Sequence, residues 1–197
     1  MVFHRSFPIF CRFTQHVPFI RKTGRNLFIF ASWIPALIFF NDNVGEVTKI
    51  TGQSMYPYLN TTYSESGSKD LCWVNKWGAQ ENLERGMLVS FWSPANPEVL
   101  AVKRIIALEG DKVFPRPPYP APVAAIPAGH VWVEGDNRDG RKTLDSNYYG
   151  PISISLLQGK VTHVLWPWAS AGAIRWREFR GRTNVIRGRK EDAPQWL

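Results

Sequence analysis

Short apolar runs separated by glycine, asparagine and proline make up most of the chain beyond residue 44. Apolar runs of about four to eight residues between such turn residues are typical of β-strands. The expected strands are 47–50, 71–74, 87–92, 98–108, 130–134 and 159–166. Strands this short and this frequent predict a mainly β domain over residues 45–170, folded as an antiparallel sheet or a barrel-like arrangement.

One continuous apolar segment precedes these strands. Residues 26–41 contain no charged side chain, and polar ends extend the segment to about residue 44. A membrane-spanning helix needs about 20 apolar residues, with a range that starts near 17, so the segment is short. Five basic residues precede it, whereas Asp42 and Glu46 follow. Because of this charge asymmetry we expect residues 26–44 to be a transmembrane anchor whose N-terminus stays on the originating side.

The N-terminal part of the chain also has other interpretations. For the apolar segment the alternatives are a buried core helix and a signal-peptide core, although no small-residue cleavage site is evident after it. Residues 1–25 are rich in arginine and free of acids, which predicts an organelle-targeting segment. The alternative is a basic leader that only sets the membrane topology.

Composition and charge exclude several classes of protein. The chain has 197 residues, of which 44% are hydrophobic and 20% charged, so it is not disordered as a whole. Its cysteines, Cys11 and Cys72, are too few for a disulfide scaffold or a thiolate zinc site. The net charge is +8, but residues 26–174 carry twelve basic and thirteen acidic side chains. A nucleic-acid-binding domain carries its charge on the fold, so we expect membrane lipid and no nucleic acid as a partner.

The remaining positive charge lies in an expected basic C-terminal tail, residues 171–197. Residues 175–192 hold seven basic and three acidic side chains. Such a tail either lies on anionic lipid or forms a solvated end, and the sequence favours neither.

The first candidate for chemistry is Ser54, in the motif GQSMYP of residues 52–57. A strand is expected to end just before this motif. Gly52 allows an unusual backbone angle there, and Pro57 fixes the exit of the turn. The Ser54 hydroxyl would then stand on a rigid turn at a sheet edge, where a nucleophile is useful. Taken alone, the motif is a weak signal, because a serine in a turn usually only forms the turn.

The second candidate is Lys103, in the expected strand 98–108. Strand side chains alternate, so Lys103 shares a face with Ala101 and Ile105. Arg104 lies on the opposite face. Burial lowers the pKa of a lysine well below its usual value of about 10.4, and a neutral amine beside a serine hydroxyl is a general base. The plainer alternative is a lysine that reaches solvent or pairs with a carboxylate.

The third candidate is a loop rich in Asp, Asn, Ser and Thr, with the motifs GDNRD at 135–139 and TLDS at 143–146. These residues either form turns only or build a hydrogen-bonding shell around an active-site amine. Their spacing does not match a calcium loop, so no metal is expected. A Ser-His-Asp triad would need His130 or His163, and both are better explained as strand residues.

In this order, the three segments resemble the type I signal peptidase family of membrane-anchored Ser-Lys proteases. The shared pattern is an anchor, then Ser-Met near a Pro, then Lys-Arg with Gly-Asp downstream, then Gly-Asp-Asn before Asp-Ser and Tyr-Gly. It occurs here at 54–57, 103–111, 135–137 and 145–151. Each motif is weak alone, whereas the joint match is specific.

A closer similarity, to the mitochondrial inner-membrane members of this family, rests on the motifs SPANP, VKRIIALEGD, GHVWVEGDN, DSNYYGPIS and THVLWP. It runs from about residue 44 to 167. It implies a basic N-terminus in the matrix and a catalytic domain in the intermembrane space. It also implies precursor proteins with hydrophobic sorting signals as substrates and a homologous second protease subunit as partner.

The resemblance implies a role for each candidate residue. Ser54 would be the nucleophile, with its backbone N–H as an oxyanion donor, and Lys103 would be the general base. Thr143 stands where bacterial members have a serine that hydrogen-bonds the lysine amine. Gly52 replaces the hydroxyl residue that gives bacterial members a second oxyanion donor. The other expected members of the supporting shell are Asp136, Asn137, Asp145 and Ser146, and no cofactor is implied.

The leading hypothesis is therefore a membrane-bound Ser-Lys endopeptidase that removes hydrophobic sorting segments. The alternative is a non-catalytic anchored subunit that stabilises an active partner, and the presence of both Ser54 and Lys103 counts against it. An apolar surface beside the site is expected to dip toward the bilayer, with core packing as the alternative for each residue. Its candidates are Tyr56, Tyr58, Trp73, Trp77 and Trp92.

Overall fold

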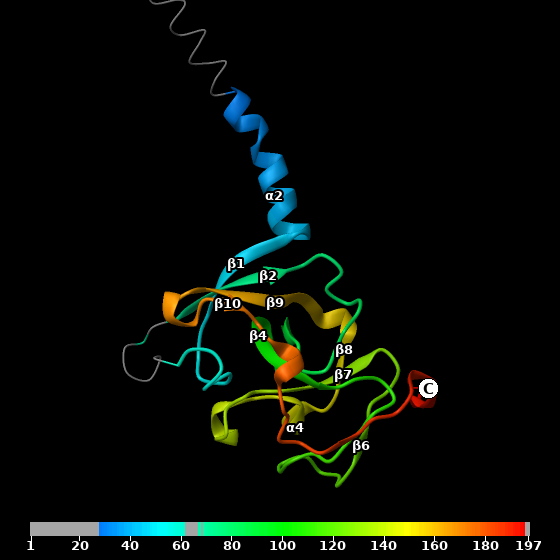
Figure 1. Ribbon diagram of the computed structural model, residues 1–197. Helices are drawn as coiled ribbons and strands as arrows, with labels where there is room; N and C mark the ends of the chain where they lie inside the picture. Colours follow the sequence, from blue (N-terminus) through cyan, green and yellow to red (C-terminus); the bar gives the residue numbers. More distant parts are fainter. Residues whose placement is uncertain (1–27, 62–66, 68, 196–197) are drawn as a thin grey trace, which may run out of the picture. The chain divides into compact units, whose positions relative to one another are not determined.

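The computed structural model describes residues 28–61, 67 and 69–195 (Figure 1). Its contacts divide the chain into two units, and the boundary along the chain lies between Asn41 and Asp42. The second unit holds the described strands and the candidate site. The expected targeting segment 1–25 and the first residues of the expected anchor lie outside the described residues.

The described part of the first unit is helical. Residues 28–32 form a helical stretch, and α2 runs over Ile34–Asn43. The two stretches are separated at Trp33, because Pro35 has no N–H to donate to the carbonyl one turn before it. The apolar side chains here are exposed. Among the residues that the structure describes, no helix is both long enough and apolar enough to cross a membrane.

The second unit is built on one large sheet in which neighbouring strands are antiparallel. The strand order is β1-β2-β9-β3-β4-β7-β8, and β10 pairs with β9. The bounds are β1 Gly45–Ile50, β2 Asp70–Asn75, β3 Leu88–Ser93, β4 Asn96–Ala107, β7 His130–Glu134, β8 Ile152–Ser153, β9 Leu157–Trp166 and β10 Gly172–Ala173.

A smaller antiparallel sheet has the order β11-β5-β6. Its strands are β5 Lys112–Val113, β6 Ala124–Ala125 and β11 Val185–Ile186. The short helical elements of the second unit are α4 Ser146–Tyr149, η1 Gly140–Lys142, η2 Ile154–Leu156, η3 Trp168–Ser170, η4 Trp176–Glu178 and η5 Lys190–Asp192.

The structure confirms the expected mainly β, antiparallel fold and all six expected strands. Strand β7 has the expected bounds, and the others agree to within two residues at each end. The two-residue strands were not expected, because a pair of residues carries no period-2 signal. The core lies along the sheets, where Phe91 and Trp132 are fully buried. Burying each large apolar side chain stabilises the fold by about 1.5–3 kcal/mol.

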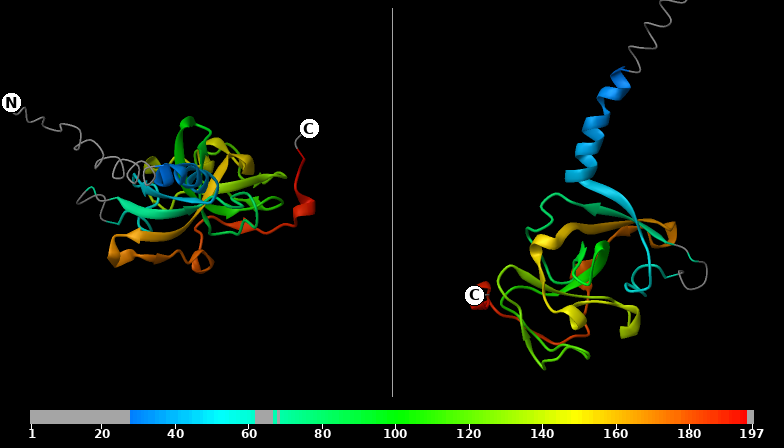
Figure 2. Two further views of the ribbon diagram at one scale, coloured as in Figure 1. Left: turned by 90° about the horizontal axis from the view of Figure 1, so that it is seen from above. Right: turned by 180° about the vertical axis from the view of Figure 1, so that it is seen from behind.

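The C-terminal part of the chain packs against the domain and does not form a separate tail from residue 171. In Figures 1 and 2, β10 and the red element η5 lie on opposite sides of the domain, and the segment between them crosses it. Ile174 is buried, and Arg177 pairs with Glu84 at 3.1 Å. The domain therefore continues past the expected boundary at residue 170. The physical reason is that basic residues of this segment find acidic partners on the domain.

Candidate active site

Ser54 lies in the turn that follows β1. Gly52 has a φ of 91° there, a left-handed backbone angle that glycine adopts readily. The side-chain amide of Asn60 donates to the carbonyl oxygens of Ile50 and Gly52, at 3.0 and 2.8 Å. Asp70 holds Asn60 in turn, because its carboxylate accepts the Asn60 N–H at 2.8 Å. The turn is therefore braced by buried polar residues that the sequence analysis did not identify.

Lys103 lies in β4, opposite Val89 of β3, and only 5% of its surface is exposed. Ser54 and Lys103 line the same cavity, of about 270 Å³. Burial lowers the pKa of Lys103 from 10.5 to about 8, although the charges of Asp145 and Asp136 act in the opposite direction. The Ser54 hydroxyl and the Lys103 amine lie in one cavity without a hydrogen bond between them. Catalytic pairs often tighten only when substrate binds.

Arg104 lies on the other face of β4, as strand alternation predicts, and is fully buried. Its Nε donates to Asp136 Oδ1 at 2.9 Å, and its Nη2 donates to Oδ2 at 2.6 Å. The rings of Tyr58 and Phe179 lie 4.6 and 4.2 Å from its guanidinium carbon. The positive charge of Arg104 is therefore paired directly with the Asp136 carboxylate. Lys103 is buried without an ion pair at such a short distance. Neighbouring cations of one strand thus differ in how closely a carboxylate pairs with them.

The loop after β7, residues 135–139, is here called the site loop. It is bonded directly to the Ser54 turn. The backbone N–H of Asn137 donates to the Ser54 carbonyl at 3.0 Å, and its side-chain amide donates to the Gln53 carbonyl at 2.6 Å. Gly135 passes so close that a β-carbon there would stand 2.6 Å from the Ser54 carbonyl oxygen. Only glycine fits at this contact between the two segments.

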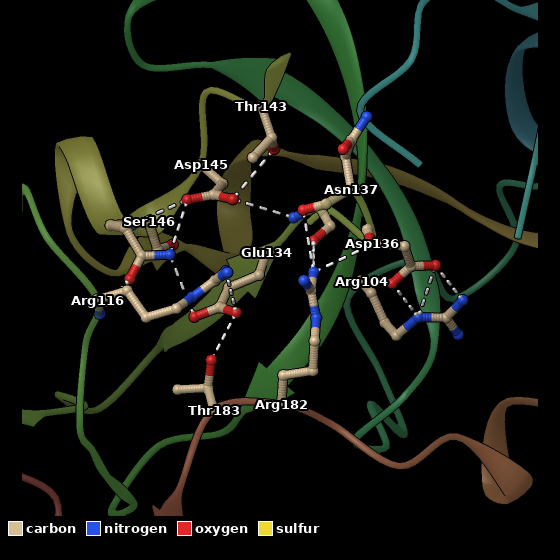
Figure 3. Close-up of polar contacts among 12 residues, drawn as sticks. Arg104, Arg116, Glu134, Asp136, Asn137, Thr143, Asp145, Ser146, Arg182 and Thr183 are labelled. Carbon is tan, nitrogen blue, oxygen red and sulfur yellow. Dashed lines mark hydrogen bonds and ion pairs between the residues drawn. The ribbon is translucent and has the colours of Figure 1, made fainter. Parts of the chain in front are cut away.

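Asp145 is the centre of a buried network beside the site loop (Figure 3). Its Oδ2 accepts the Thr143 hydroxyl at 3.0 Å and the Gly135 N–H at 3.1 Å. Its Oδ1 accepts the backbone N–H and side-chain amide of Asn147 at 3.1 and 2.9 Å. Thr143 thus commits its single proton to Asp145. Toward Lys103 its hydroxyl oxygen would act only as an acceptor.

Ser146 and Glu134 brace strand β7. The Ser146 hydroxyl accepts the Val133 N–H at 3.0 Å, so this residue supports the strand. Glu134 was missed in the sequence analysis, where its only signal is an acid that ends an apolar strand. The buried Glu134 carboxylate accepts hydrogen bonds, partly drawn in Figure 3, from Arg116, Trp132, Asn147 and Thr183 at 2.7–3.2 Å.

The two histidines among the described residues lie away from the cavity of Ser54 and Lys103. His163 is exposed, and His130 Nδ1 lies 2.9 Å from the Ala128 carbonyl oxygen. Neither histidine lines the cavity of Ser54 and Lys103. Within residues 28–61 and 69–195, no three His, Cys, Asp or Glu side chains are grouped so as to hold a metal ion.

Comparison with known proteins places this arrangement in a family. The family model for signal peptidase, peptidase S26, matches residues 23–116, a range that includes Ser54 and Lys103. The mitochondrial inner membrane protease subunit 2 of Schizosaccharomyces pombe is 36% identical over 180 residues, 88% of this chain and 97% of that protein. The subunit 2 of Mus musculus is 40% identical over 135 residues, 68% of this chain and 74% of that protein. The mitochondrial inner membrane protease subunit 1 of Mus musculus is 34% identical over 137 residues, 67% of this chain and 76% of that protein. These similarities confirm the resemblance drawn from the sequence, and the chain belongs to the peptidase S26 family of signal peptidases.

Proposed function

We propose that this chain is a membrane-anchored serine endopeptidase that removes hydrophobic sorting or signal segments from precursor proteins at the mitochondrial inner membrane. Membership in a signal peptidase family supports the reaction class. The names of the relatives support the location. The proposal assigns Ser54 as the nucleophile and Lys103 as the general base.

The observation that carries the proposal is a lysine of lowered pKa in the same cavity as a serine hydroxyl. With a pKa of about 8, roughly one tenth of the Lys103 amines are neutral at pH 7. With the ordinary value of 10.5 the neutral fraction would be about 3 in 10,000, so burial enriches the base form about 300-fold. A serine hydroxyl needs such a base when no histidine is at hand.

In the first half-reaction, the Ser54 oxygen attacks the carbonyl carbon of the scissile peptide bond while Lys103 takes its proton. The tetrahedral intermediate collapses as the C–N bond breaks, and the lysine ammonium returns the proton to the leaving amine. Water then attacks the acyl ester on Ser54 and gives a proton to Lys103. The ester bond breaks, and Ser54 recovers its hydrogen from the ammonium. One residue thus serves as base and acid in turn.

The groups around Ser54 and Lys103 contribute by holding the site in position. We assign the backbone N–H of Ser54 as an oxyanion donor, and Asn137 holds the carbonyl side of the same turn. Gly52 has no side chain, so a second donor must be a different group. Removing one oxyanion donor lowers the rate by about 10²–10³-fold. Asp145 keeps Thr143 and the site loop in place beside the turn.

The proposal includes the membrane and a partner. Residues 26–44 are assigned as the anchor, with the N-terminus in the matrix and the domain from residue 45 in the intermembrane space. A homologous second subunit is the proposed partner, because a relative of this chain is named subunit 1. Trp73 is half-buried, but exposed aromatic side chains support contact with lipid. These are Tyr56, Tyr58, Trp77 and Trp92, which are 41–69% exposed.

The test is cleavage of a precursor peptide with a small residue before the scissile bond. Full-length protein in detergent is assayed with and without the second subunit, as wild type, Ser54→Ala and Lys103→Met, with circular dichroism to verify folding. Loss of cleavage in both folded variants supports the Ser-Lys mechanism. Unchanged cleavage in both moves the chemistry to the partner and makes this chain a non-catalytic subunit.

A further inference from the structure

Residues 174–190, here called the C-terminal strap, run across the domain after β10 (Figures 1 and 2). A hydrogen bond holds the strap against the domain near its start, where the Trp176 indole N–H donates to Glu84 at 3.1 Å. A second hydrogen bond holds it near its end, where the Gly188 N–H donates to Asp111 at 2.9 Å. Its middle therefore has a defined path over the domain.

Arg182 lies in the middle of the strap and reaches the site loop (Figure 3). Its Nη2 donates to the carbonyl oxygens of Asp136 and Asn137 at 3.0 Å each, and to that of Gly135 at 3.4 Å. Three successive carbonyls that converge on one point bring their negative ends together. A cation at that point compensates them through charge-assisted hydrogen bonds.

The neighbours of Arg182 hold it over the loop. Thr183 is buried, and its hydroxyl donates to Glu134 at 2.7 Å. On the other side, the Phe179 ring lies over the guanidinium of Arg104. Much of the Arg182 side chain is exposed. Its backbone is nevertheless anchored on both sides, so little further backbone entropy is lost when the guanidinium contacts the loop.

The loop that Arg182 holds is the one bonded to the nucleophile turn. Arg182 donates a hydrogen bond to the carbonyl oxygen of Asn137, while the N–H of Asn137 donates to the Ser54 carbonyl. We infer that Arg182 is a positioning residue for the reaction: it holds the site loop against the Ser54 turn and so keeps Ser54 in the cavity that it shares with Lys103. This inference rests on the proposed Ser-Lys function.

The test compares three variants of the full-length protein in detergent with its second subunit. Arg182→Gln removes the cation, and Arg182→Lys keeps a cation with several N–H donors. Arg180→Gln is the matched control, because Arg180 is an exposed arginine of the same strap that lines a cavity shared with Arg182. Each variant is assayed for kcat, KM, the pH profile of kcat/KM and thermal unfolding. Hydrogen exchange of residues 135–139 is measured by mass spectrometry.

For Arg182→Gln we expect kcat to fall about tenfold with KM within a factor of about two, because loop position affects the reacting groups more than binding. A looser loop admits water to Lys103, so the pKa in the kcat/KM profile should rise above its wild-type value. Exchange in the site loop should be faster. Arg182→Lys should recover at least half of the lost kcat, and Arg180→Gln should match wild type.

Two results overturn the inference. One is Arg182→Gln that matches Arg180→Gln in kcat, pH profile and exchange. The other is a loss of kcat that merely follows the unfolded fraction, with an unchanged pH profile. If Ser54→Ala still cleaves, the proposed function fails instead. Hydrogen exchange then decides the structural claim alone: faster exchange of the site loop in Arg182→Gln supports it, and unchanged exchange refutes it.

Discussion

Replacing Lys103 by methionine separates the chemistry of this residue from its effect on the fold. Methionine keeps an unbranched side chain and lacks the amine. The pKa of Lys103 is about 8 in the folded protein, against 10.5 for an exposed lysine. The folded state therefore binds fewer protons than the unfolded state between these values, and stability rises with pH there. We expect Lys103→Met to be inactive, yet more stable than the wild type at pH 7.

The size of the effect follows from the two pKa values. The gap between 10.5 and about 8, at about 1.4 kcal/mol per pKa unit, corresponds to roughly 3 kcal/mol. This unfavourable contribution is fully present below pH 8 and is relieved as the pH rises toward 10.5. Lys103→Met should therefore gain up to roughly 3 kcal/mol in the free energy of unfolding at pH 7, and almost nothing near pH 10.5.

The assay is urea unfolding of the full-length protein in detergent, followed by tryptophan fluorescence at several values between about pH 7 and 10. Other groups titrate in both proteins, so only the difference between wild type and variant is used. Lys49→Met is the control, because Lys49 lines the same cavity but is exposed. In parallel, wild-type kcat/KM should rise about tenfold per pH unit below pH 8 and level off above it.

Two outcomes would refute this reasoning. The first is a Lys103→Met variant no more stable than wild type at pH 7, or a difference that does not shrink toward pH 10. The second is a wild-type kcat/KM that stays flat between about pH 6 and 9. Either result means that burial does not lower the pKa of the Lys103 amine, and it contradicts the assignment of Lys103 as the base.

Further substitutions test the site loop and the buried ion pair. Gly135→Ala puts a β-carbon against the Thr143 hydroxyl, so we expect at least a tenfold loss of kcat and about 1–3 kcal/mol of stability; wild-type values in both assays would mean that the loop shifts freely. Arg104→Met leaves the buried Asp136 carboxylate without its cation, so urea unfolding should show a loss of about 3–5 kcal/mol. Adding Asp136→Asn should recover part of that loss, and an unchanged urea midpoint in the single variant contradicts this account.

The large sheet was predictable because its long strands carry strong local patterns. Strands β4 and β9 hold runs of apolar residues bounded by turn signals, which a sequence reveals without tertiary information. The C-terminal strap was mistaken for a tail because its arginines look like a solvated basic run. The acidic partners of Arg177 and Lys190 are Glu84 and Glu109, which belong to loops far away in the sequence. The apolar residues Ile174 and Phe179 were the available signal that this segment packs.

The candidate site was predictable to the extent that its chemistry is local. Ser54 and Lys103 were singled out from residue type and strand alternation, and their roles stay predictions until the variants are measured. Three further residues that brace the site were not found, because their contacts leave no recognisable motif in the sequence. Asn60 begins a run of polar residues without a motif, Glu134 ends an apolar strand, and Arg182 lies in the expected tail.

The contact between Asn137 and Gln53 has a consequence for the order in which the molecule is made. It joins residues 84 positions apart, and closing a loop of that length costs roughly 4 kcal/mol of chain entropy. Arg182 then reaches the same loop from 45 positions further along. Synthesis proceeds from the N-terminus, so a growing chain holds Ser54 and Lys103 long before it holds the groups that arrange them. On the proposed function, a growing chain that has not yet reached Arg182 lacks one of the contacts that hold the site loop, and it should cleave more slowly than a chain that includes this residue.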